Sequence, residues 1–446
     1  MKKAVLAFSL VLILGTAFIF AGGQKSTVPA GRVGVTYMGW GNEVEQQVVQ
    51  TTLDTFNNSQ TRIWATYIPT PEDYMTKLNT MAASNSLPDA AMLGEDQVLR
   101  WAANNMLLDV SDLFTSQEEQ PLPFIRFVYQ GRTVAYSLAN ETMLLYYNRD
   151  LFEKAGLPYP PAKAENAWTW AQYVDVAKKL TKDSSGKTPY DAGFNSENIV
   201  TYGTTFGYGA GFWPIMGKSN GGGWFSDDGK TLLINRPETI EAAQAIADLH
   251  LKDFVAPNPA TGLGDAAIAM LSGQVAMVID GQWAIGLNYL NATKEGLRYG
   301  VAVLPKFKTA VTCNTGGPAV VFRSSKNPNE AKEMVKQFYD PEKNLLFIQT
   351  GIWMPIRLSW YQNEQHIRTW ADHPNRPPVE EYKEAVINYT LNNLVQTPYF
   401  YFPGWSEFND LLNPAMDPVW QGTQTARQAL DAVYPALKEV VDRYNR

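Results

Sequence analysis

The sequence predicts an α/β protein of two lobes, each a mostly parallel sheet flanked by helices, with a cleft between them at a hinge. The chain has 446 residues, whereas one domain usually holds roughly 100–200. Short apolar strands alternate with amphipathic helices along it, which is typical of parallel sheets. No internal repeat or low-complexity linker separates the halves. Ordered crossings should therefore join the lobes, and such crossings favour a hinge.

The first elements alternate between strand and helix. Residues 34–38 (GVTYM) predict a strand, and Asn42 can cap a helix whose apolar residues recur on one side. The TPED motif at residues 70–73 combines an N-cap, a proline at the first helical position and two acids, so it predicts a helix that reaches about Ser84. Residues 88–93 (PDAAML) predict the next short strand.

The same alternation continues in the second half of the chain. Residues 143–147 (MLLYY) predict a strand, and a helix from Asp150 should end at Gly156. The capping box at residues 169–172 opens another helix that runs to about Leu180. The remaining expected elements are helices at 265–271 and 423–446 and strands at 275–279, 301–304 and 319–322.

The N-terminus has the pattern of an export signal. Two lysines precede an apolar run from Ala4 to Phe20, and small residues follow it. We therefore expect residues 1–21 to be a signal peptide, with an uncleaved membrane anchor as the alternative. No cysteine ends the apolar run, so no lipid anchor is expected. The expected location is the periplasm or the extracellular space.

Charge and cysteine content exclude several classes of protein. Without Lys2 and Lys3 the chain keeps 35 basic and 44 acidic side chains, a net charge of −9, which argues against nucleic acid as a partner. Cys313 is the single cysteine, so disulfides and Cys-rich metal sites are excluded. No HExxH or CxxC motif occurs. The sequence predicts no cofactor and no metal.

Residues 217–219 (GKS) resemble fragments of two catalytic motifs. Gly211 is one residue too far upstream to complete a phosphate-binding loop. The GxSxG string from Gly217 to Gly221 has no strand before it and no helix after it in the sequence pattern. With only three histidines in the chain, a serine hydrolase has little material for its base. Neither motif supports its usual function here.

Three carboxylates lie beside the ends of predicted strands: Asp96, Glu141 and Asp280. Open α/β sheets bind ligands at such positions. Paired carboxylates there hold hydroxyl groups or cleave a glycosidic bond. The alternative for each is a helix cap or a solvent-facing side chain.

Four tryptophans lie in Gly- or Pro-bearing loops beside strand ends: Trp40, Trp213, Trp283 and Trp405. The C–H face of a pyranose is apolar and its rim carries hydroxyl groups, so flat rings on its faces and acids at its edge match it. These rings are expected to stack on a sugar, and core packing is the alternative for each.

Several motifs in a fixed order resemble one known family. They are YMTKL at 74–78 with SLPD at 86–89, YYNRDLFEKAGLP at 146–158, MLSGQVAM at 270–277 with GQW at 281–283, and LP at 304–305 with GG at 316–317 and SKN at 325–327. Together they resemble the extracellular solute-binding proteins of ABC sugar importers, the family that includes the maltose/maltodextrin-binding proteins. A departure from many members is the missing lipid-anchor cysteine.

The resemblance implies two discontinuous lobes that close over a sugar. By motif order, these lobes would be residues 32–139 with 311–355 and residues 142–306 with 358–446. The family's ligand residues carry over to Trp40, Asn42, Glu43, Asp96, Glu141 and Trp283. Trp213, Asp280 and Trp405 complete the expected ligand-binding set. The six aromatic residues among the seven glycines of residues 206–225 are expected on the second lobe's wall of the cleft.

The sequence thus predicts a monomeric protein that captures a mono- or oligosaccharide and delivers it to the permease subunits of an ABC importer, without a catalytic step. One alternative is a secreted carbohydrate-cleaving enzyme that uses Asp96, Glu141 or Asp280. Another is a binding protein for a peptide or a different polar solute.

Overall fold

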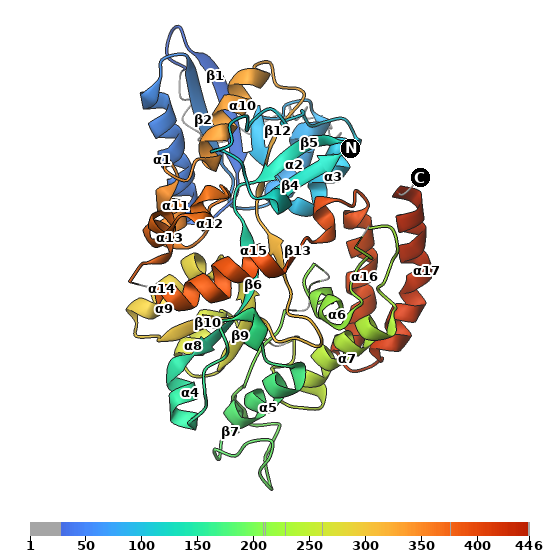
Figure 1. The fold of residues 1–446 in the computed structure, drawn as a ribbon. Helices are drawn as coiled ribbons and strands as arrows, with labels where there is room; N and C mark the ends of the chain where they lie inside the picture. Colours follow the sequence, from blue (N-terminus) through green and yellow to red (C-terminus); the bar gives the residue numbers. More distant parts are fainter. Residues whose placement is uncertain are drawn as a thin grey trace, which may run out of the picture.

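The computed structural model describes residues 28–444, apart from residues 208, 210, 228, 261 and 375. The predicted signal peptide, residues 1–21, lies outside the described residues. Two sheets form the centres of two halves of the molecule, one above the other in Figure 1. No helix among the described residues is long and apolar enough to cross a membrane.

The first sheet has six strands in the order β2-β1-β3-β12-β5-β4. Their bounds are β1 (Val33–Gly39), β2 (Ile63–Pro69), β3 (Ala90–Met92), β4 (Arg126–Tyr129), β5 (Arg132–Ser137) and β12 (Pro318–Val321). The helices around it are α1 (Glu43–Ser59), α2 (Tyr74–Ala83), α3 (Glu95–Ala103) and α10 (Pro328–Lys336), in the upper half of Figure 1.

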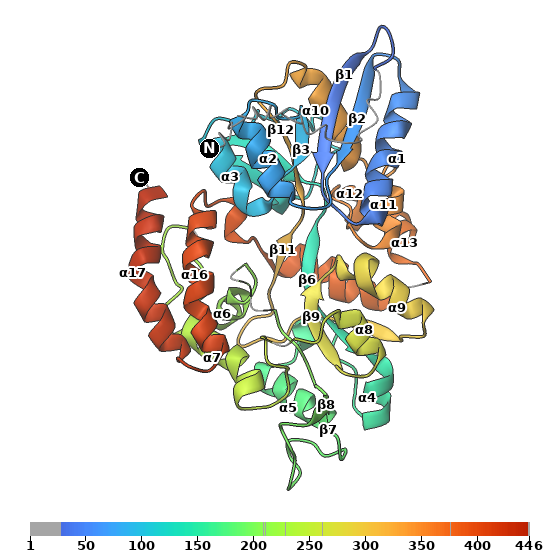
Figure 2. The same ribbon diagram turned by 180° about the vertical axis from the view of Figure 1, so that it is seen from behind.

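The second sheet has the strand order β10-β6-β11-β13, and β9 also pairs with β6. Its strands are β6 (Glu141–Asn148), β9 (Met277–Gly281), β10 (Tyr299–Ala302), β11 (Thr312–Thr315) and β13 (Leu394–Val395). The main helices around it are α4 (Arg149–Ala155), α5 (Trp170–Leu180), α8 (Ala266–Leu271), α9 (Leu290–Lys294) and α15 (Tyr389–Asn393). Figure 2 shows β6 and β11 in the middle of the molecule, between the two halves.

Two groups of helices complete the structure. The first comprises α6 (Pro214–Asn220), α7 (Pro237–Leu251), α16 (Trp405–Trp420) and α17 (Ala426–Tyr444), which pack together on one side of the molecule (Figure 1). The second comprises α11 (Leu345–Thr350), α12 (Ser359–Gln362), α13 (Glu364–Ala371) and α14 (Val379–Tyr382). A small hairpin of β7 (Lys182–Asp183) and β8 (Ile199–Thr201) lies at the lower end in Figure 1.

The predicted α/β architecture is confirmed, but both sheets are mixed rather than mostly parallel. Strand β1 pairs in parallel with β2 and β3, and β11 with β13. The other pairings between strands of the described residues are antiparallel. One reason is that β4 and β5 form an antiparallel hairpin. Another is that the consecutive strands β11 and β12 belong to different sheets, where β11 runs antiparallel to β6 and β12 runs antiparallel to both β3 and β5.

Local helix signals account for several element ends. Asn42 and Glu45 form a capping box at the start of α1, and Gly156 ends α4 in the left-handed conformation at φ +65°. The predicted start of the second helix at Thr70 is wrong, since α2 begins only at Tyr74. The Thr70 N–H donates to the Gly39 carbonyl at 3.0 Å and so continues the pairing with β1.

Residues 206–225 do not form one long loop. Pro214 stands at the first position of α6, and Gly221 ends that helix at φ +103°. Trp213 and Trp224 are fully buried on either side of it. Phe206 and Phe225 are buried as well, so four of the five described rings of this segment pack into the core. Tyr208 lies outside the described residues.

Candidate functional site

A cavity of about 270 Å³ lies where strand ends of the two sheets meet. Its lining combines apolar, aromatic and acidic side chains from both halves of the molecule. The lining residues are Trp40, Glu45, Met92, Glu95, Glu141, Phe212, Trp283, Leu287, Thr315, Gly317, Ile352 and Trp353. We call this cavity the acidic cleft.

Aromatic rings form much of its wall. Trp40 follows β1 and packs edge-on against Tyr74, with 5.0 Å between ring centroids. The Tyr74 hydroxyl lies between two carbonyl oxygens, 2.5 Å from that of Met92 and 3.0 Å from that of Met38. Trp353 stacks on Phe347 with centroids 3.9 Å apart. These contacts fix the orientation of two indole rings before any ligand arrives.

The third indole depends on a glycine. Trp283 follows β9, and a Cβ built on Gly281 would lie only 1.9 Å from the Trp283 ring. Only a residue without a side chain therefore lets this ring lie against the backbone. Phe212 lies next to it, with 6.3 Å between the ring centroids.

Three carboxylates converge on the same cavity from three elements. Glu45 lies in the first turn of α1, and its Oε2 accepts the Asn42 N–H at 2.8 Å. Glu95 opens α3, and its Oε1 accepts the Thr315 hydroxyl at 2.6 Å and the Gly316 N–H at 3.1 Å. Glu141 opens β6 and is only 9% exposed. Within the part of the chain that the structure describes, no hydrogen bond or ion pair reaches its carboxylate.

Burial makes these carboxylates hard to ionise. It raises the pKa of Glu45, Glu95 and Glu141 above their ordinary value of 4.5, and most of all that of Glu141. The negative charges of Glu95 and Glu45 raise the Glu141 pKa further. No lysine, arginine or histidine is among the described residues that line the cleft. The acidic cleft therefore has no positive charge of its own to offset three acids.

Three of the nine residues predicted to bind ligand line the acidic cleft: Trp40, Glu141 and Trp283. Asn42 and Glu43 are exposed at the start of α1, where Asn42 caps the helix and holds Glu45. Asp96 follows Glu95 but accepts from the Gln97 amide instead of lining the cavity.

The other three predicted residues lie elsewhere. Trp213 is 0% exposed and packs edge-on against Trp420, and Trp405 stacks on Phe408 in the core. Neither ring can reach a ligand in this arrangement, so we leave both out of the site. Asp280 is partly buried on β9 and does not line the cleft, and burial raises its pKa to about 6.

The sequence patterns did not point to several lining residues. Glu95 directly precedes the predicted Asp96 and shares its position after β3, so the same strand-end argument could have selected it. Glu45 could have been found as the partner of Asn42 in a capping box. Phe212 was among the rings of residues 206–225, and it is the described ring of that segment that lines the cleft. Trp353, after α11, carried no local signal.

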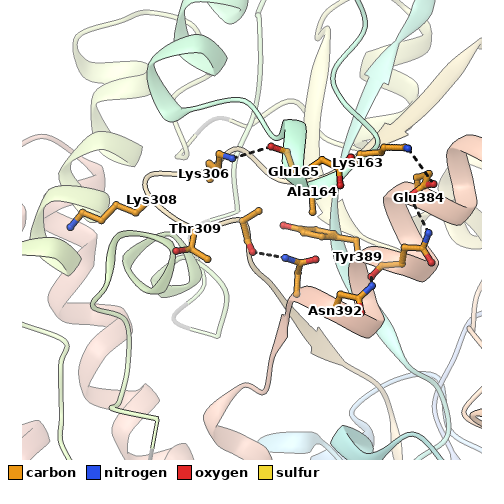
Figure 3. Close-up of a pocket in the computed structure, with 12 residues that line it drawn as sticks. Lys163, Ala164, Glu165, Lys306, Lys308, Thr309, Glu384, Tyr389 and Asn392 are labelled. Carbon is orange, nitrogen blue, oxygen red and sulfur yellow. Dashed lines mark hydrogen bonds and ion pairs between the residues drawn. The ribbon is translucent and has the colours of Figure 1, made fainter.

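A larger hollow of about 700 Å³ lies on the second half, away from the strand ends that form the cleft. Figure 3 shows that its polar side chains mostly bind each other or the backbone. Lys163 lies 3.9 Å from the Glu384 carboxylate, and the Lys306 amine donates to the Glu165 carbonyl at 3.4 Å. Lys308 donates to the Asn220 carbonyl at 2.7 Å. Because its three lysines and Glu384 are paired, we regard the acidic cleft as the better candidate site.

Comparison with known proteins gives matches over most of the chain. The family of bacterial extracellular solute-binding proteins matches residues 41–344. The sn-glycerol-3-phosphate-binding periplasmic protein UgpB of Rhizobium meliloti is 28% identical over 334 residues, 71% of each chain. Its counterpart in Brucella melitensis is 27% identical over 328 residues, 70% of this chain and 69% of the relative.

Solved structures agree on the fold. An ABC substrate-binding protein of Listeria monocytogenes in complex with cycloalternan has a TM-score of 0.75 at 22% identity, covering 92% of this chain and 99% of that one. The maltose-bound protein MalE3 of T. maritima has a TM-score of 0.72 at 21% identity, covering 91% and 99%. The matched family and these structures are binding proteins rather than enzymes.

Proposed function

The chain belongs to the bacterial extracellular solute-binding proteins, and on that premise we propose that it captures a mono- or oligosaccharide outside the cytoplasm and delivers it to the permease of an ABC importer. The observation that carries this proposal is the acidic cleft, in which aromatic rings and carboxylates face one cavity. Ring faces bury the apolar C–H face of a sugar, and carboxylates accept hydrogen bonds from its hydroxyl groups. Export, a monomeric state and the absence of a catalytic step are parts of the same proposal.

Charge favours a sugar over the ligand that the relatives' names give. Those relatives are named for binding sn-glycerol 3-phosphate. A phosphate group needs cationic side chains or N–H donors that offset its charge. The described lining of the acidic cleft offers three carboxylates and no cation, so it has no side chain that would offset the charge of a phosphate.

We further propose that the lobes close over the ligand by a hinge at three adjacent crossings, near residues 139–142, 316–317 and 355–358. The lobe boundary expected between residues 306 and 311 lies inside the second half, because β11 pairs with β6 and the chain crosses between β11 and β12. Two of these crossings are joined by the Asn140 N–H, which donates to the Met354 carbonyl at 3.4 Å. Glu141 lies directly at the first crossing and also lines the cleft. A ligand that contacts Glu141 would therefore act close to the axis of closure.

A thermal-shift screen over a panel of sugars, followed by calorimetry with each hit, tests the proposal. A binder raises the melting temperature with ligand concentration and gives a one-site isotherm that ends when the site is full. An assay for new reducing ends runs in parallel. Sustained release of sugar would support a carbohydrate-cleaving enzyme, and binding of peptides but no sugar would support a different solute.

A further inference from the structure

The carboxylates of the acidic cleft narrow the class of ligand more than the shape of the cavity does. Glu45, Glu95 and Glu141 come from α1, α3 and β6 and line one cavity of about 270 Å³. The first two carboxylates already accept hydrogen bonds from Asn42, Thr315 and the backbone. Glu141 is the one of the three for which the described residues supply no donor, although it is nine-tenths buried. A buried carboxylate without a donor is costly unless a ligand supplies one.

A neutral sugar would satisfy only part of this arrangement. Its hydroxyl groups can donate hydrogen bonds to Glu141, but they bring no charge to offset three neighbouring acids. A protonated amine brings both a positive charge and up to three N–H donors. Aromatic faces also attract a cation, and Trp40, Trp283, Trp353 and Phe212 line the same cavity. The rings and the carboxylates of the cleft thus favour the same kind of ligand group.

We propose that the ligand of the acidic cleft is a sugar that carries a protonated amine, bound through that amine by Glu141 together with Glu45 and Glu95. This inference rests on the proposed function and narrows its substrate class. It assigns the aromatic rings to the sugar face and the carboxylates to the ammonium group.

The proposal predicts proton release on binding. The groups that act on Glu141 are Glu95 and Glu45, and both raise its pKa. A bound ammonium group favours the ionised form of the carboxylates and so lowers their pKa values. At a pH near those pKa values, ligand binding therefore releases protons from the cleft. A neutral sugar gives no such electrostatic release.

Calorimetry with matched pairs of sugars tests the inference. Each pair differs only in an amine or a hydroxyl group: glucosamine and glucose, galactosamine and galactose, mannosamine and mannose, and their available oligomers. We expect at least one amino sugar to bind ten-fold or more tightly than its hydroxyl partner at low salt and neutral pH. That preference should shrink as salt is added. Titrations in buffers of different ionisation enthalpy, repeated at several pH values from acidic to neutral, should show net proton release on binding.

Two variants connect the preference to the cleft. Glu141→Gln keeps the shape of the side chain and should reduce the amino sugar's advantage by at least five-fold. Glu118→Gln removes the same charge from an exposed position outside the cleft lining, and it should leave the amino sugar's advantage unchanged. The salt dependence and proton release of the wild-type protein need no variant, so they remain informative if Glu141→Gln unfolds.

The outcomes separate this inference from the proposed function. If hydroxyl sugars bind as tightly as their amino partners, or tighter, the inference is overturned and sugar capture stands. If no sugar of either kind binds, both are overturned. An amine preference that Glu141→Gln leaves intact in a folded protein contradicts the assignment to this carboxylate.

Discussion

Replacing Gly281 by alanine should weaken ligand binding, although Gly281 is not among the residues that line the acidic cleft. The added Cβ would lie 1.9 Å from the Trp283 ring, whereas ordinary contact begins near 3.4 Å. The ring must therefore move by about 1.5 Å, because protein interiors have no free space to absorb the overlap. Strand β9 is held in place by its pairing with β6 and by the Tyr146 hydroxyl, which donates to the Gly281 carbonyl at 2.9 Å. The overlap is therefore relieved by displacement of the Trp283 indole rather than of the β9 backbone.

The expected loss is that of one aromatic anchor in a desolvated cleft. Such an anchor contributes about 1–3 kcal/mol to binding, which corresponds to a roughly 5–150-fold weaker Kd. Calorimetry with the tightest sugar from the panel measures it. Trp283→Ala should cause a loss of the same order. The Gly281→Ala/Trp283→Ala double variant should bind no worse than Trp283→Ala alone, because both substitutions remove the same contact between the Trp283 ring and the ligand.

Gly207→Ala is the matched control for the backbone effect of adding a methyl group. A Cβ at position 207 meets no atom within 4 Å, so this variant should bind as the wild type does. Melting temperatures of all variants show whether they are folded. Wild-type affinity in a folded Gly281→Ala protein would refute the reasoning that this glycine positions Trp283, and additive losses in the double variant would separate the two residues.

Three further expectations follow from the arrangement of the fold. Small-angle scattering should show a smaller radius of gyration with bound sugar than without it, and an unchanged curve at saturation would contradict hinge closure. Trp213→Ala should lower the melting temperature by removing a fully buried ring, about 3–5 kcal/mol of stability, rather than remove a ligand contact; a folded variant with normal stability and lost binding would return Trp213 to the site. Hydrogen bonds from the backbone of Asn195, Lys187 and Ser185 lower the pKa of Asp183 from 3.8 to about 2. This carboxylate therefore stabilises the fold above about pH 4 and loses that effect as the pH falls toward 2; acid unfolding of Asp183→Asn beside the wild type should differ in that window, and identical profiles would contradict the assignment.

The sequence alone was sufficient for features that depend on neighbours along the chain. Asn42 with Glu45, Thr169 with Gln172, and Gly156 set helix ends because a cap is made by residues three or four positions apart. Apolar runs likewise located most strands, and the order of motifs was enough to indicate the family. In the site, Trp40, Glu141 and Trp283 were found because each stands beside a strand end.

Tertiary structure decided what depends on distant segments. Thr70 has the sequence of a helix cap, yet it pairs with Gly39 because β1 and β2 lie side by side. Trp213 and Trp283 both stand in glycine-bearing sequence, and only the folded chain buries the first, against Trp420 at the end of α16, while the second lines the cleft.

The charge of the cleft is the clearest case. Glu45, Glu95 and Glu141 are separated by about 50 residues each in the sequence, and none carries a local sign that it shares a cavity with the others. The pairing of β1 with β3 places α1 near α3, and Glu95 accepts from Thr315, which pairs with Glu141 of β6. The burial that follows raises the pKa of each carboxylate. Local patterns report the chemistry of single residues, whereas electrostatic coupling depends on distance in space, which only the folded chain defines.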